Sequence, residues 1–282
     1  INRISEDLGT KARVSIRVNP DIDPKTHPYI STGLKTSKFG IAIEDSLDAY
    51  IEASKMNNIQ VVGIDAHIGS QIFDLQPFED SLARLENLFY KLRDMGINIQ
   101  FIDIGGGLGI KYKDDDIPPT KADFASKIIK IMKNINCNLV LEPGRSLVGN
   151  AGYLITKVVY EKKSNKKNFL IVDAGMNDIL RPSLYSAYHK ISKSISSSKN
   201  KKVYDIVGPI CETGDVLSYD VALNDIKLGE NLVIHSAGAY GSVMSSNYNS
   251  RPKVPEVLVS GKTSYTIKKK ETIDQLLQNE VI

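Results

Sequence analysis

The amino-acid sequence predicts an α/β fold over residues 1–149 and a mainly β domain over residues 150–282. In the first part, short apolar strands alternate with segments that carry apolar residues at helical spacing, which favours a parallel sheet with helical crossovers. After Gly149 the pattern changes to short apolar segments separated by loops rich in Gly, Asn, Ser and Lys. The 282 residues, of which 41% are hydrophobic and 24% charged, suffice for two globular domains.

The first part contains four predicted strands and three predicted helices. The strands cover residues 13–19, 61–67, 101–104 and 138–142. The helices cover residues 45–56 and 78–95, the latter ending at Gly96, and a third segment that begins at Thr120. Asp123 stands three residues after Thr120, which is the spacing of a capping box. The apolar face of this third helix comprises Phe124, Ile128, Ile131 and Ile135.

The second part contains six predicted strands, over residues 152–160, 168–173, 203–207, 231–235, 255–259 and 263–269. One helical stretch is predicted near residues 179–191. The segment 193–202, KSISSSKNKK, has the composition of a loop.

Composition and charge exclude several classes of protein. A formal net charge of +3, with lysines spread over separate short clusters, does not predict a nucleic-acid partner. No apolar run is long enough to cross a bilayer, so we expect no membrane association. Two distant cysteines, Cys137 and Cys211, do not make a disulfide framework, and we expect a cytoplasmic protein.

Residues suited to chemistry follow the predicted strands of the first part. These strands end at or near Asn19, His67, Gly105 and Glu142. Because the carboxyl ends of parallel strands meet at one edge of a sheet, we expect these residues to converge.

Three glycines, Gly105, Gly106 and Gly107, form a turn after the third strand. Their backbone N–H groups could bind a phosphate, although a plain tight turn explains the same glycines. The position of the turn favours a phosphate site, because Gly144 and Arg145 follow the next strand and the guanidinium could add positive charge.

Glu142 and His67 are candidates for contact with an aromatic cofactor. A carboxylate at a strand end could pair with a cationic ring nitrogen and stabilise its protonated form. His67 has two interpretations, a hydrogen-bonded core histidine or a ring that stacks on the cofactor.

The second part offers further candidates. Arg181 and Tyr185 are four residues apart and would share one face of a helix, although they could be ordinary surface residues. Cys211 stands beside Glu212 without neighbouring metal ligands, so we expect no zinc site, and Cys211 could be simply a buried thiol. Tyr240 lies in AGAYG, a turn of small residues that would expose its ring to a ligand.

Together these segments resemble the fold-type III decarboxylases that depend on pyridoxal 5′-phosphate (PLP), and within them the diaminopimelate decarboxylase family. The resemblance covers nearly the whole chain. It is carried by GLKTSKFG, HIGSQI, EPGRSLVGNAG, DAGMNDILRPSLYSAYH and GPICETGD, in this order. It implies the C-terminal half of a TIM (β/α)8 barrel followed by a β domain. It also implies decarboxylation of meso-2,6-diaminopimelate to L-lysine and CO2, the last step of lysine biosynthesis.

The resemblance implies a role for each candidate residue. For the cofactor, His67 stacks on the pyridine ring, Glu142 contacts its nitrogen, and the phosphate is bound by Ser70, Gly105, Gly106 and Gly107. Gly144 and Arg145 are further cofactor-binding residues. For the substrate, the implied contacts are Arg145, Arg181, Tyr185, Glu212 and Tyr240, with Tyr240 also touching the cofactor. Cys211 reprotonates the substrate carbon. Cys211 and Glu212 reach the site of a second subunit, so a homodimer with shared active sites is implied.

The sequence departs from this family at one point. The family attaches PLP through a lysine in a Tyr-Ala-x-Lys type segment at a strand end, and no predicted strand of the first part ends in lysine. Lys35, Lys38 and Lys111 all lie in predicted loops. We therefore expect the lysine and the early barrel strands to lie outside residues 1–282, and this segment alone to be inactive and poorly stable.

Three other functions stay open at this point. The chain could be an ornithine, arginine or carboxynorspermidine decarboxylase, which the combination of Arg181 with Glu212 argues against. It could be a regulator that kept the fold and lost the chemistry, which would not require Glu142, Arg145, Cys211 and Glu212. A phosphate-binding barrel isomerase without PLP would leave the Cys-Glu pair and the β domain unexplained.

Overall fold

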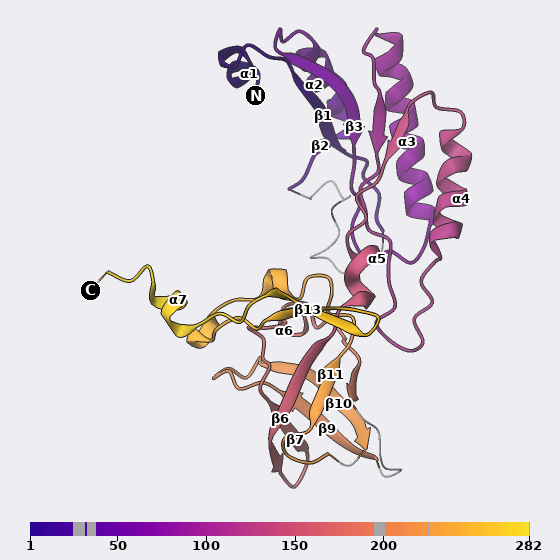
Figure 1. Ribbon diagram of the computed structural model, residues 1–282. Helices are drawn as coiled ribbons and strands as arrows, with labels where there is room; N and C mark the ends of the chain where they lie inside the picture. The colour runs from indigo at the N-terminus through magenta and orange to yellow at the C-terminus, as the bar shows by residue number, and fades with distance from the viewer. Residues whose placement is uncertain (25–31, 33–37, 195–200, 225, 282) are drawn as a thin grey trace. The chain divides into compact units, whose positions relative to one another are not determined.

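The chain divides into two compact units, each described here by itself (Figure 1). The computed structural model describes residues 1–24, 32, 38–194, 201–224 and 226–281. The first unit comprises Ile1–Ile110 and Asp116–Leu147, and the second comprises Lys111–Asp115 and Val148–Ile282. The short segment Lys111–Asp115 thus leaves the first half of the sequence to join the second unit, where the Asn150 side-chain amide donates to the Lys111 carbonyl over 2.8 Å.

A parallel sheet forms the centre of the first unit. Its strands are β1 (Ala12–Asn19), β2 (Ile41–Ala42), β3 (Ile59–Asp65), β4 (Phe101–Asp103) and β5 (Asn138–Val140). Their order in the sheet is β2-β1-β3-β4-β5, and every pairing is parallel. All four predicted strands are confirmed. The prediction missed β2, because two residues carry no readable periodicity.

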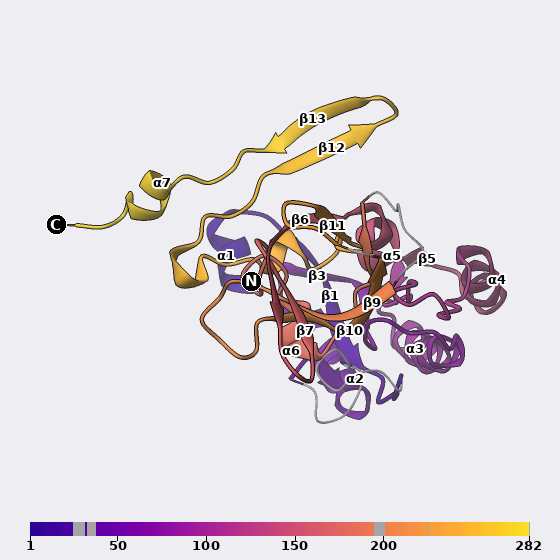
Figure 2. The same cartoon turned by 90° about the horizontal axis from the view of Figure 1, so that it is seen from below.

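Helices cover one face of this sheet (Figure 1 and Figure 2). They are α2 (Ile43–Ser54), α3 (Gln76–Asp94) and α4 (Lys121–Met132), preceded by α1 (Asn2–Asp7) and followed by α5 (Arg145–Val148). The apolar stripe of α3 is buried in the core, with Leu82, Leu85 and Leu92 fully buried. Thr120 caps α4 as expected, since its hydroxyl accepts from the Asp123 N–H and the Asp123 side chain accepts from the Thr120 N–H.

A six-stranded mixed sheet forms the core of the second unit. Its strands are β6 (Leu154–Lys163), β7 (Asn168–Val172), β8 (Ile191–Lys193), β9 (Lys201–Val207), β10 (Val216–Asn224) and β11 (Asn231–Ile234). The order is β10-β9-β7-β6-β11-β8, and because the edge strands β8 and β10 approach each other, the sheet curls into a nearly closed barrel. The remaining elements are η2 (Gly149–Ala151), α6 (Arg181–Tyr185), η3 (Ser242–Met244), η4 (Tyr248–Ser250), the hairpin of β12 (Glu256–Ser260) and β13 (Thr263–Lys268), and α7 (Ile273–Leu277). Figure 2 shows the hairpin as a two-stranded ribbon followed by α7.

The prediction for the second unit was wrong for one helix and missed two strands. The helix expected near residues 179–191 is only Arg181–Tyr185, because Ser186 adopts a left-handed conformation with φ of 51° and ends it. Ile191–Lys193 is a strand instead. Strand β10 was not predicted, because its register shifts twice and Asp220 has φ of 52°, which interrupts the alternation of buried and exposed residues.

Within the described residues, no helix combines the length and apolar character that crossing a membrane requires.

The capping box of α4 gives a test of the fold. Replacing Thr120 by alanine removes the acceptor for the Asp123 N–H, and we expect a loss of about 1 kcal/mol in the free energy of unfolding. Thr272→Ala is the matched control, because it removes an equivalent box from α7, a five-residue helix without buried residues. Urea denaturation should show a smaller change for Thr272→Ala than for Thr120→Ala. Equal changes in the free energy of unfolding for the two variants would contradict a role of α4 packing in global stability.

Candidate functional site

The glycine turn after β4 fits into a space too small for any side chain. A Cβ at Gly105 would lie 2.5 Å from Nδ1 of His67, and one at Gly106 would lie 2.3 Å from the Glu142 carbonyl oxygen. Gly105 also has φ of 69°, a conformation that favours glycine. The Glu142 N–H donates to the Gly105 carbonyl over 2.8 Å. The turn therefore fixes the segments that follow β3 and β5 against each other.

His67 is held by this turn in a defined protonation state. The Gly106 N–H donates to Nδ1 of His67 over 3.2 Å, so Nδ1 carries a lone pair and the proton of the neutral ring is on Nε2. Burial of the ring lowers the pKa of His67, and the positive charge of Arg17 lowers it further. The imidazole is consequently neutral near pH 7, which suits a ring that lies against another aromatic ring.

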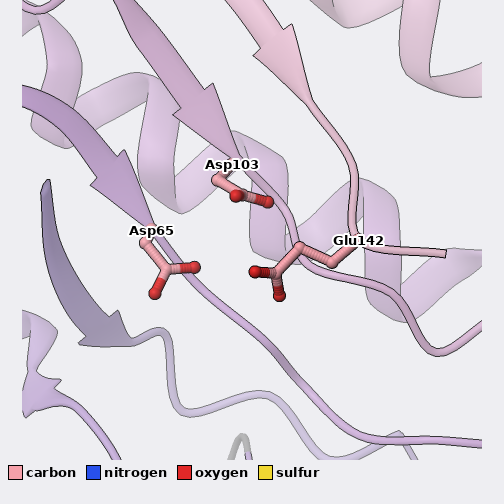
Figure 3. Close-up of side chains that lie close together, drawn as sticks. All are labelled: Asp65, Asp103 and Glu142. Atoms are coloured by element: carbon pink, nitrogen blue, oxygen red, sulfur yellow. The ribbon is translucent and has the colours of Figure 1, made fainter. Parts of the chain in front are cut away.

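Three carboxyl groups face a common space at the ends of β3, β4 and β5 (Figure 3). Asp65, Asp103 and Glu142 each offer an oxygen, and these atoms all lie within 4.8 Å of one another. Burial and the neighbouring charge of Asp103 raise the pKa of Asp65 to about 6, although Arg17 opposes this. Burial also raises the pKa of Asp103, whose Oδ1 accepts the Gly105 N–H over 2.8 Å. The cluster thus concentrates negative charge that a cation would stabilise.

Arg17 balances part of this charge. It stands opposite Asp65 in the pairing of β1 with β3, and its guanidinium lies 4.9 Å from the centre of the Phe39 ring. Phe39 belongs to the GLKTSKFG motif, of which residues 33–37, including Lys35, lie outside the described residues.

A second group of polar residues lies close to the glycine turn. The buried Arg145 guanidinium donates to the Ser70 hydroxyl oxygen through Nε at 3.2 Å and Nη2 at 3.0 Å. Because that oxygen accepts both bonds, the Ser70 proton can be donated elsewhere. Within the described residues no acceptor is found for the Gly107 N–H, whereas the N–H groups of Gly105 and Gly106 are bonded to Asp103 and His67. This differs from the expectation that all three glycines offer their N–H groups to one phosphate.

The second unit holds the predicted substrate residues on two elements. Arg181 and Tyr185 lie at the two ends of α6, and the Arg181 side chain is buried while Tyr185 is half-buried. Cys211 and Glu212 lie on the exposed loop between β9 and β10. The Ser183 hydroxyl donates to the Gly214 carbonyl over 2.8 Å and so connects α6 to this loop.

Asp215 fixes the conformation of the loop that carries Cys211. Its buried carboxylate accepts the Ile210 N–H and the Met176 N–H, each over 2.7 Å. A Cβ at Gly208 would lie 2.3 Å from the same carboxylate, which explains the glycine in GPICETGD. Glu212 in turn forms a hydrogen bond with the Tyr248 hydroxyl, and this raises the pKa of Tyr248.

Tyr240 has an unusual backbone conformation. Its φ is 58°, in the left-handed region that large side chains rarely adopt, and its side chain remains 41% exposed. Such strain occurs often at ligand sites, so this conformation favours the predicted contact with a ligand.

Sequence reasoning missed several residues of these groups. Asp65 and Asp103 were not singled out, although both lie within predicted strands; in the structure they are the last residues of β3 and β4. Tyr248, the partner of Glu212, carried no signal, and His189, the partner of Arg181, was given no role although it ends the motif DAGMNDILRPSLYSAYH. Gly144 differs from the glycines of the turn because there is room for a side chain at this position: an added Cβ would meet no described atom within 4 Å.

Comparison with known proteins identifies the family. Residues 1–149 match the model of the pyridoxal-dependent decarboxylase pyridoxal binding domain. The chain belongs to the pyridoxal-dependent decarboxylases. Curated relatives include the diaminopimelate decarboxylases of Aquifex aeolicus, 49% identical over 99% of this chain and 66% of the relative, and of Neisseria meningitidis serogroup A, 48% identical over 100% and 69%.

A solved structure from Helicobacter pylori, a diaminopimelate decarboxylase complexed with L-lysine, has a TM-score of 0.94 at 42% identity. The match covers 98% of this chain and 69% of that one, so the chain spans about two thirds of the length of these relatives. The predicted fold class is confirmed, and membership of a decarboxylase family excludes the phosphate-binding isomerase.

The residues of the first unit fit PLP, the cofactor of this family. The Gly107 N–H has no acceptor within the described residues, Arg145 and Ser70 offer donors for a phosphate, and Glu142 offers a carboxylate for a ring nitrogen.

The raised pKa of Asp65 predicts a pH-dependent stability. Because the folded form binds this proton more tightly than the unfolded chain, whose pKa is near 3.8, the free energy of unfolding falls as the pH rises from about 4 to about 6. We expect Asp65→Asn to reduce this slope, to which Asp103 also contributes, and to stabilise the cofactor-free enzyme at pH 7 by about 1 kcal/mol, a value reduced for partial solvent exposure. Thermal unfolding between pH 4 and 7.5 measures the effect, with Asp94→Asn, an exposed carboxylate at the end of α3, as the control. A slope in Asp65→Asn equal to that of the wild type would contradict the assignment.

Proposed function

We propose that the enzyme carrying this chain uses PLP to decarboxylate meso-2,6-diaminopimelate at its D-centre, yielding L-lysine and CO2. This is the last step of lysine biosynthesis. The names of the relatives and the L-lysine in the Helicobacter pylori complex support the assignment.

The first unit would bind the cofactor. The phosphate would accept from the Ser70 hydroxyl, the Arg145 guanidinium and the Gly107 N–H, three donors of one site. Glu142 would hold the proton of the pyridine nitrogen, and the neutral ring of His67 would lie against the pyridine. When bound, PLP supplies an electron sink for the pair of electrons that the departing carboxylate leaves behind.

The observation that carries the substrate assignment is that the second unit contains both a cationic side chain, Arg181, and an anionic one, Glu212. Diaminopimelate has an amino acid group at each end, so its distal end needs a partner for a carboxylate and a partner for an ammonium. Arg181, with Tyr185 on the same helix face, would bind the carboxylate, and Glu212 would bind the ammonium. An enzyme that acts on ornithine would need only the acidic group.

Cys211 would return a proton to the substrate carbon after CO2 leaves. Its thiol is exposed, and Asp215 holds its loop in one conformation. We propose a homodimer in which Cys211 and Glu212 serve the site of the second subunit and Tyr240 touches both cofactor and substrate. Free thiols at Cys137 and Cys211 support a cytoplasmic location.

The decisive experiment measures CO2 release by the PLP-loaded enzyme from meso-diaminopimelate, ornithine and arginine in parallel. We expect release from diaminopimelate alone. Release from ornithine or arginine would overturn the roles of Arg181 and Glu212. No release from any of them would favour the non-catalytic regulator.

Glu142 gives a sharper test of the cofactor site. Replacing Glu142 by glutamine keeps its shape but removes the charge that stabilises a protonated pyridine nitrogen, so we expect kcat to fall at least about 100-fold. Bound PLP, measured by absorbance after gel filtration, should remain, because Ser70 and Arg145 are unchanged. Glu52→Gln, on the exposed face of α2, is the matched control and should keep both properties. Full activity of Glu142→Gln would contradict the role of the carboxylate.

A further inference from the structure

His189 connects the substrate-binding helix to the barrel of the second unit. Its side chain is fully buried, with 0% of its surface exposed. Nε2 of His189 lies 2.8 Å from Nη1 of Arg181, and Nδ1 lies 2.8 Å from the His235 carbonyl oxygen. Both ring nitrogens are therefore engaged, one by the arginine and one by the backbone.

The chemistry of the two partners fixes the direction of these bonds. A guanidinium can only donate, so Nε2 of His189 must carry a lone pair and accept. A carbonyl can only accept, so Nδ1 must carry the proton and donate to His235. His189 is thus a neutral imidazole with a single possible tautomer. Its acceptor is aimed at Arg181 because the backbone holds its other nitrogen.

Tyr112 supports the same guanidinium from another direction. The Arg181 guanidinium carbon lies 4.7 Å from the centre of the Tyr112 ring, within the range of a cation–π contact. The Tyr112 ring also meets the His189 ring edge to face, with centres 5.2 Å apart and planes at 85°. Tyr112 is buried and comes from Lys111–Asp115, the segment of the first half that joins this unit. The Tyr112 ring and the hydrogen bond to His189 thus both hold the guanidinium.

We propose that His189 and Tyr112 are positioning residues that orient the Arg181 guanidinium for the distal carboxylate of the substrate. The inference rests on the proposed function. A guanidinium binds a carboxylate best through two parallel N–H bonds, which requires its plane to be fixed before the ligand arrives. A ring face fixes the plane, and the Nε2 acceptor fixes rotation within it. The arrangement makes affinity depend on a carboxylate in the ligand and so contributes to specificity.

Two ligands and two variants test this in the PLP-loaded enzyme. L-Lysine retains the carboxylate that Arg181 would bind, whereas cadaverine (1,5-diaminopentane) has the same chain and amines without it. His189→Asn keeps a donor near Nδ1 for the His235 carbonyl but removes the acceptor for Arg181. His189→Gln places an amide oxygen near the former Nε2. Calorimetry measures the Kd of each ligand, and steady-state assays give KM and kcat for diaminopimelate.

We expect His189→Asn to raise the Kd of L-lysine and the KM of diaminopimelate about tenfold, as for loss of a charge-assisted hydrogen bond. The Kd of cadaverine should change less than about twofold, and kcat less than about threefold, because the bond acts on substrate binding. His189→Gln should restore most of the affinity for L-lysine. His235→Asn is the matched control, because that ring contacts Ser192 and Tyr153 and should affect both ligands equally or not at all.

Equal weakening of L-lysine and cadaverine by His189→Asn, or no weakening of either, would overturn the proposal. If His189→Asn does not fold, Tyr112→Leu, which removes the ring face, is judged by the same ratio of the two Kd values. Failure of the wild-type enzyme to release CO2 from diaminopimelate would instead overturn the proposed function. The ligand comparison does not depend on turnover, so the two failures are distinguishable.

Discussion

The space between the ends of β3 and β5 is the constraint on which the first unit depends. The turn of Gly105 and Gly106 passes through it with its backbone in contact with His67 and Glu142, and no side chain fits there. The same backbone also forms the hydrogen bonds that orient these residues, one to Nδ1 of His67 and one from the Glu142 N–H. One missing Cβ per residue thus fixes both the shape of the site and the tautomer of its histidine.

The second unit fixes the positions of its site residues through buried polar side chains instead of glycines. Its site residues lie on a short helix and on a loop, elements that have little intrinsic stability. Buried polar side chains compensate for this. Asp215 accepts two backbone N–H groups and holds the loop of Cys211, while His189 holds Arg181. Because an unpaired buried polar group is costly, each of these contacts strongly favours one arrangement over its alternatives.

The elements that could be predicted from the sequence are those with long or capped patterns. Helix α3 has a continuous apolar stripe and was found with nearly correct ends. Helix α4 was found at its capping box, although Ile135, expected on its apolar face, lies beyond the end of the helix at Met132. Strand β10 and the end of α6 depend on left-handed residues, Asp220 and Ser186, whose conformations result from tertiary contacts and leave no periodic trace. In the site, the residues proposed to contact ligands could be predicted because they belong to recognisable sequence motifs. Their supports, such as Asp65 and His189, became visible only when distant segments were brought together.

The charge of the first unit is matched to a cationic ligand. Three carboxyl groups within 4.8 Å repel one another, and for Asp65 and Asp103 this repulsion adds to the cost of burial, so that both hold a proton more tightly than usual. Arg17 offsets this only in part, since the pKa of Asp65 still reaches about 6. A protonated ring nitrogen beside Glu142 would supply the missing positive charge and favour ionisation of the neighbouring carboxyls. By the same electrostatic argument, these carboxylates would keep the ring protonated. The cluster and a pyridinium would therefore stabilise each other's charged forms, which is the state that electron withdrawal from a substrate requires.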